Sequence, residues 1–90
     1  MMTMSKVKEA KREFEELSTL FNNTYSTTNI SLLSSKGIAL LIKVLEAKLV
    51  YKELSEDMDR FHRYTKPIIS MQISKAKGAL HASRFLEAKI

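Results

Sequence analysis

Apolar residues recur at steps of three and four positions along most of this chain, which is the period of an amphipathic helix. No glycine or proline interrupts residues 4–21, so we expect a first helix there with one buried face. The apolar positions of this segment are Val7, Ala10, Phe14, Leu17 and Phe21, and we expect Leu20 to widen the face.

A polar run, NNTYSTTN at residues 22–29, follows the first helix. Asparagine, serine and threonine side chains compete with helical backbone hydrogen bonds, which predicts a loop. Asn29 or Ser31 can then cap the next helix by accepting a hydrogen bond from its first N–H groups.

The middle of the chain, residues 30–64, has a broad apolar face and predicts a central helix with neighbours on both sides. Gly37 weakens the beginning of this helix, and a short turn can precede it. Ser55, Glu56 and Asp57 are equally typical of a new helix start, since acidic residues favour N-termini. One helix over 30–64 and two helices divided near Ser55 are both compatible with the pattern. The two apolar stripes are Leu40, Val44, Ala47, Tyr51, Leu54, Met58 and Phe61, and Ile38, Leu41, Leu45 and Leu49.

Pro67, the single proline, opens the last apolar run. Proline costs about 3 kcal/mol inside a helix and almost nothing in its first turn, and it disfavours helical backbone at the residue before it. The sequence therefore predicts a chain reversal at Lys66 and a last helix over 67–89. We expect the core face of that helix to comprise Ile69, Ile73, Ala76 and Leu80, continued by Ala79, Ala82, Leu86 and Ile90.

The composition favours one small helical domain. Of 90 residues, 44% are hydrophobic and 28% charged, with two glycines, one proline and no cysteine. Few turn-forming residues favour a few long helices, and the lack of cysteine excludes disulfides and thiolate chemistry. We expect an all-α antiparallel bundle over residues 1–90, with three long helices, or four if the central one divides.

The N-terminus is charged and lacks the apolar core of a signal peptide, and no apolar run approaches the ~20 residues that span a bilayer. We therefore expect a cytoplasmic protein without a transmembrane segment. The formal net charge is +5, which permits nucleic acid, anionic lipid or an acidic protein as partner. The segment from Pro67 onward contains four cations and only one anion, Glu87. The cations are Lys75, Lys77, Arg84 and Lys89.

No pattern in the sequence predicts catalysis or metal binding. His62 and His81 are the two histidines; Asp59 precedes His62 by three residues, but a metal site needs three or four convergent ligands. We expect no cofactor, no metal and no enzymatic activity. Residues 60–66, RFHRYTK, interleave bases with aromatics as single-stranded nucleic-acid binders do. The interpretation we favour is that Phe61 and Tyr64 pack inward while the cations point outward.

The segment Leu41–Ala79 resembles the immunity proteins that protect bacteria from pediocin-like (class IIa) bacteriocins. The resemblance begins with Lys43-Val44-Leu45-Glu46, followed by Leu49 and Leu54. It continues through the aromatic and basic residues at 60–66 and ends with Pro67-Ile68-Ile69-Ser70-Met71 and Ile73-Ser74-Lys75-Ala76. It implies a helical bundle in the producer's cytoplasm, peripheral to the membrane. It also implies binding to a bacteriocin complex with the membrane part of the mannose phosphotransferase permease.

On this resemblance, basic side chains would orient docking and a few aromatic anchors would supply affinity. The expected binding residues are Arg60, Arg63, Tyr64, Lys66, Lys75, Lys77, Arg84, Phe85 and Lys89. Two other functions remain as alternatives: a helical-hairpin accessory partner of a secreted toxin, as in type VII secretion, and a small basic nucleic-acid-binding protein.

Overall fold

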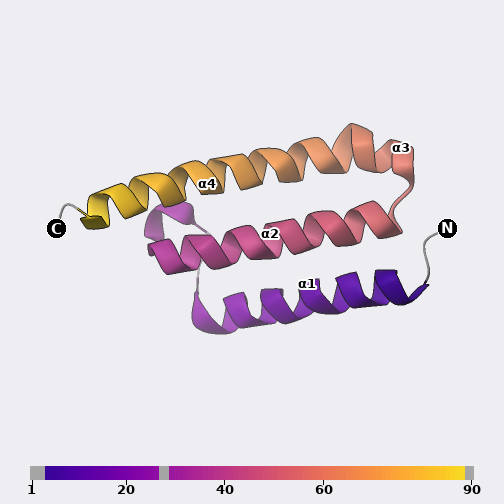
Figure 1. Cartoon of the computed structure of the whole chain (residues 1–90), viewed down its shortest axis with the longest axis horizontal. Helices are drawn as coiled ribbons and strands as arrows, with labels where there is room; N and C mark the ends of the chain where they lie inside the picture. The colour runs from indigo at the N-terminus through magenta and orange to yellow at the C-terminus, as the bar shows by residue number, and fades with distance from the viewer. Residues whose placement is uncertain (1–3, 27–28, 89–90) are drawn as a thin grey trace.

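Three long helical runs lie side by side in a computed structural model that describes residues 4–26 and 29–88 (Figure 1). The long helices are α1 (Met4–Thr24), α2 (Ser35–Ser55) and α4 (Lys66–Ala88). A 3-10 turn, η1 (Ile30–Leu32), precedes α2, and α3 (Met58–Arg60) leads through a π-helical segment, η2 (Phe61–Thr65), into α4. The described residues contain no strand, so the expected all-α class is confirmed.

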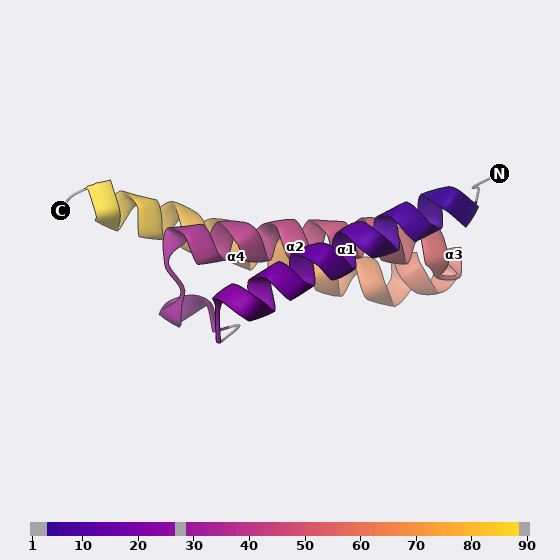
Figure 2. The ribbon, with the colours of Figure 1, turned by 90° about the horizontal axis from the view of Figure 1, so that it is seen from below.

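Helix α2 lies between α1 and α4, as its broad apolar face predicts (Figure 1). Consecutive long helices run antiparallel, and Figure 2 shows α1 inclined across α2. The Cα radius of gyration is 14.7 Å, against about 12 Å for a compact chain of this length. The molecule is therefore an elongated, open layer of helices, 51 × 27 × 19 Å along its principal axes.

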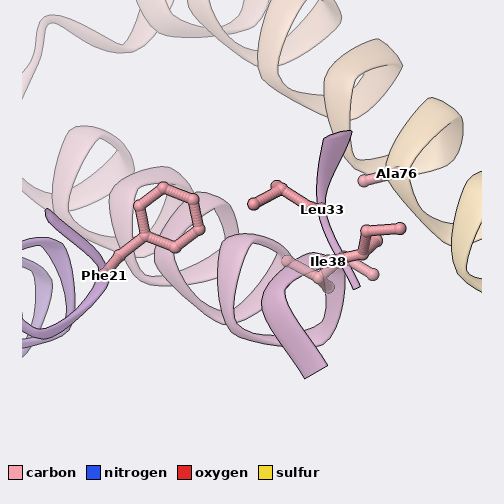
Figure 3. Packing of buried hydrophobic residues seen from close by; sticks show 5 residues of the cluster. Phe21, Leu33, Ile38 and Ala76 are labelled. Carbon is pink, nitrogen blue, oxygen red and sulfur yellow. The ribbon is translucent and has the colours of Figure 1, made fainter. Parts of the chain in front are cut away.

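The core joins all three long helices through side chains that the helical period brings to facing surfaces. Phe21 comes from α1, Ile38 and Ile42 from α2, and Ala76 from α4, and Leu33 from the preceding connection completes the cluster (Figure 3). Leu20, which we expected to widen the buried face of α1, is exposed. Because α1 packs mainly against α2, its buried face is narrow.

Helix α1 is longer than its polar end predicts. It runs to Thr24, so the first three residues of the expected loop are helical. The Thr24 hydroxyl donates to the Leu20 carbonyl at 2.7 Å, and the Tyr25 N–H donates to the Phe21 carbonyl at 2.8 Å. These bonds satisfy groups at the end of the helix, which lets polar residues extend it.

The start of α2 depends on a close approach between the backbone at Gly37 and the preceding connection. Ser34, rather than Asn29 or Ser31, caps the helix, and its hydroxyl accepts from the Gly37 N–H at 3.3 Å. A Cβ added at Gly37 would lie 3.0 Å from Tyr25 Cε1 and 3.2 Å from Leu33 Cδ2. Glycine thus lets the Tyr25 ring cover the first turn of α2.

The two glycines should respond oppositely to the same substitution. Gly78→Ala should raise the free energy of unfolding by up to about 1 kcal/mol, because alanine favours helix and nothing lies within 4 Å of the added Cβ. The free energy of unfolding of the Gly37→Ala variant should be about 1–2 kcal/mol lower than that of the Gly78→Ala variant, because the Tyr25 ring must shift to make room for the added methyl group. Urea unfolding of dilute protein measures both, and equal stabilisation by the two substitutions would contradict the close approach.

The chain reverses direction at Glu56 and Asp57, so the division near Ser55 is confirmed. Both residues have extended ψ angles, 159° and 134°, and the Asp57 carboxylate accepts from the Arg60 N–H at 3.2 Å to cap α3. The predicted reversal at Lys66 is wrong, since Lys66 has φ −60° and ψ −46° and lies in continuous helix.

The π-helical segment explains how Pro67 is accommodated without a break. The Lys66 N–H bonds to the Phe61 carbonyl, five residues back, so the wide turn ends one residue before the proline. A wider turn moves the preceding carbonyls away from the proline ring, and Pro67 then occupies the first turn of α4. The wide turn contains one residue more than an α-helical turn. Phe61 and Ile69, eight residues apart, therefore lie on the same face, as residues seven apart do in a regular α-helix, and both are buried.

The core face of α4 follows Ile69, Ile73, Ala76 and Leu80, as predicted, and Ala79 also packs against the core. Ser83, on the same side, is half-buried. Ala82 and Leu86, which we expected to continue it, are exposed, and Ile90 lies outside the described residues. The Ser35 hydroxyl donates to Glu87 Oε2 at 3.0 Å and ties the end of α4 to the first turn of α2.

Candidate partner-binding surface

Eight of the nine expected binding residues lie within the described part of the chain, and every one of them is exposed. Lys89 lies outside it. The eight do not form one patch, because the corner and two separate faces of α4 divide them. They are Arg60, Arg63, Tyr64, Lys66, Lys75, Lys77, Arg84 and Phe85.

The corner formed by α3 and η2 carries one exposed aromatic ring among cations. Tyr64 is 59% exposed, against the expectation that it packs inward, whereas Phe61 is 2% exposed as predicted. In the wide π turn, three residues span less than a full turn, so Tyr64 points away from Phe61. A stacking surface for nucleic-acid bases would have Tyr64 and the exposed imidazole of His62 here but not Phe61, which weakens that interpretation.

Polar contacts anchor the corner to the end of α2. The Thr65 hydroxyl donates to Glu56 Oε1 at 2.5 Å, and Lys52 Nζ lies 3.9 Å from Glu56 Oε2. Arg63 pairs with Asp59 at 3.3 Å within the same helical run, and both side chains are well exposed. Such an exposed pair stabilises little, so the Arg63 guanidinium remains available to an acidic partner.

A second group, the basic row, consists of Lys66, Lys77 and Arg84 on α4. They are eleven and seven residues apart, which is about three and about two turns of an α-helix, so the three cations lie along one side of the helix. No ion pair between described residues involves any of them. The basic row is therefore a solvated line of positive charge beside the core face.

A third group is apolar and lies on the other side of α4, away from the core face. We call it the outer stripe. Its members follow alternating steps of three and four residues, and all of them are exposed. They are Ile68, Met71, Lys75, Gly78, Ala82 and Phe85.

The outer stripe includes two residues, Ile68 and Met71, that were not predicted as binding residues. Both belong to the apolar run after Pro67, which we interpreted only as the opening of the last helix. The spacing of three and four residues predicts such a stripe, but Lys75 and Gly78 in its middle are not apolar side chains and interrupt the pattern.

An open groove runs beside the outer stripe, between η1 and the C-terminal half of α4. Its volume is about 670 Å³, and Lys75 and Ala82 belong both to the groove and to the stripe. Its other apolar lining residues are Ile30, Leu33, Ile38, Ala79 and Leu86.

Among the described residues, no three histidine, cysteine, aspartate or glutamate side chains converge as metal ligands would. Within that part of the chain, no helix combines the length and apolar character needed to cross a bilayer. No protein-family model matches the chain, and neither a curated protein nor a solved structure matches it significantly.

Proposed function

We propose that this chain is a non-catalytic binding protein that protects a bacterial cell from a pore-forming, pediocin-like bacteriocin. The observation that carries the proposal is the corner, where an exposed tyrosine lies among exposed cations. This corner and the first half of α4 fall inside Leu41–Ala79, the segment that resembles the immunity proteins. Exposed aromatic side chains beside arginine are typical of the residues that dominate binding energy at protein interfaces.

The partner in this proposal is the bacteriocin bound to the membrane part of the mannose permease, approached from the cytoplasm. Arg60, Arg63 and Lys66 steer and orient the approach to an acidic surface, as charges at the rim of interfaces do. Tyr64 supplies affinity by burying its ring against the partner. Only contact is required of the protein, and no covalent step is involved.

Expression of the chain in a strain sensitive to class IIa bacteriocins tests the proposal. Protection against at least one member of a panel is the expected result, and unchanged killing by every member would contradict it. The same cells report localisation, since the proposal requires the protein in the cytoplasmic fraction or bound at the inner membrane face.

Tyr64→Ala should lower the bacteriocin concentration that the cells tolerate by roughly tenfold or more, because loss of an anchor costs at least about 1.4 kcal/mol of binding. Leu20→Ala is the control, since Leu20 is also a large exposed side chain but lies on α1. Circular dichroism should show both variants folded. Full protection by the Tyr64 variant would remove the corner from the binding site.

A further inference from the structure

The outer stripe gives α4 a second apolar face that the three-helix layer leaves uncovered. Ile68 is 54% exposed and Met71 is 65% exposed, although both are large apolar side chains. Gly78 in the middle of the stripe has no neighbour within 4 Å of an added Cβ, so no contact inside the chain explains a glycine there. Glycine disfavours the middle of a helix, and it is typical of places where another backbone approaches closely.

The spacing of the outer stripe is that of a coiled-coil seam, with Ile68, Lys75 and Ala82 at one heptad position and the other three members at the second. When the stripe is laid antiparallel against itself, each residue of the first set meets one of the second. Ile68 then faces Phe85, Met71 faces Ala82, and Lys75 faces Gly78. The inner layers each pair a long side chain with a small one, and the same layers repeat on both sides of a two-fold axis.

We propose that the outer stripe docks a second copy of this chain, α4 against α4 in antiparallel orientation. In that dimer α4 acquires neighbours on both sides, as α2 already has within one copy. The stripe extends over about 26 Å of helix from Ile68 to Phe85, at about 1.5 Å per residue.

The charges of the chain oppose self-association less at this face than at the basic row. A chain with a net charge of +5 repels its copy, and the basic row would bring like charges together. The positions that flank the outer stripe carry no lysine, arginine, aspartate or glutamate. They are Pro67, Gln72, Ser74, Ala79, His81 and Leu86.

The single cation of the stripe is compatible with pairing. Lys75 lies opposite Gly78 of the second copy and not opposite another lysine, so its aliphatic stem can cross the glycine while its ammonium group reaches water. Met71 of the second copy, placed at the Ala82 layer, lies beside the apolar groove between η1 and α4. The basic row, on another side of α4, remains accessible in the dimer.

The test compares molar mass by light scattering and sedimentation over a range of protein concentrations. Wild-type protein should approach twice the chain mass of 10.3 kDa. Met71→Glu should weaken the dimer at least about tenfold, because it replaces a large apolar side chain of the seam with a carboxylate that loses water on association, and Lys75, four residues along the same helix, can pair with that carboxylate in the monomer as well. Lys77→Gln is the matched control: it also lowers the charge by one unit but lies outside the stripe, and it should leave the dimer unchanged.

Adding Ala82→Lys to the Met71→Glu chain tests the register. In the antiparallel pairing, the carboxylate introduced at position 71 faces the ammonium group introduced at position 82 of the other copy. The two-fold axis makes this contact twice, so the double variant should regain the dimer.

Wild-type protein that stays monomeric at every concentration would overturn the proposal, and so would a dimer insensitive to Met71→Glu. A double variant that associates no better than the Met71→Glu chain, with wild-type helicity, would overturn the antiparallel register.

Discussion

Phe61→Ala should lower the free energy of unfolding by about 3–5 kcal/mol, the largest stability effect that we expect from one substitution. Phe61 is the largest fully buried side chain among the described residues, at 2% exposure. Removing the ring leaves a cavity where the π-helical segment meets α2. A domain of this length has a total stability of about 5–13 kcal/mol, so the variant loses a large part of it.

Urea and thermal unfolding followed by circular dichroism measure this loss, and the melting temperature should fall by roughly 12 °C or more. Tyr64→Ala is the matched control, because Tyr64 belongs to the same π-helical segment and is exposed. Its stability should change by less than about 0.5 kcal/mol. A loss below about 1 kcal/mol in the Phe61 variant would show that Phe61 does not pack as the structure has it.

The second large effect separates two adjacent isoleucines. Ile69→Ala should cost about 2–5 kcal/mol, because Ile69 is 3% exposed in the face of α4 that packs on the core. Ile68→Ala makes the same chemical change at a position that is 54% exposed, and its cost should stay below about 1 kcal/mol. Denaturant unfolding of both variants at low protein concentration keeps self-association out of the comparison.

A stability loss for Ile68→Ala equal to or larger than that for Ile69→Ala would contradict the assignment of Ile69 to the core face of α4. The same pair also bears on the dimer, since Ile68 and not Ile69 belongs to the outer stripe. Sedimentation of the Ile68 variant should therefore show weaker association with little change in unfolding, and sedimentation of the control chain Lys77→Gln should match wild type.

Local patterns in the sequence correctly predicted the helices and most of their buried faces. The periodic positions of α1, the two-sided face of α2, and Ile69, Ile73 and Ala76 in α4 are confirmed, because burial follows helical period. The candidate binding residues within the described part of the chain are exposed, since lysine and arginine side chains rarely lose contact with water. Their division into a corner, a basic row and the outer stripe required the helix bounds, because one inserted residue in a π turn rotates every position before it.

The errors concern places where two local signals compete. The sequence predicted a reversal before Pro67, but the chain already reverses at residues 56 and 57, where the Asp57 carboxylate caps α3. The wide turn at 61–65 then avoids the clash of the proline ring with the preceding helical turn. Tyr64 was expected to pack with Phe61, but the same wide turn separates the two rings. Both outcomes follow from the burial of Phe61 and Ile69 on one face of the helical run formed by η2 and α4, which packs against α2.

By itself, the sequence determined that this protein is all helical, which faces of its helices are apolar, and that its C-terminal arm is basic, because period and charge are properties of neighbouring residues. Only the tertiary structure decided where the chain reverses, which tyrosine is exposed, and that α4 keeps a second apolar face uncovered. These features depend on which surface each helix gives to α2, and α2 can cover only one side of each neighbour.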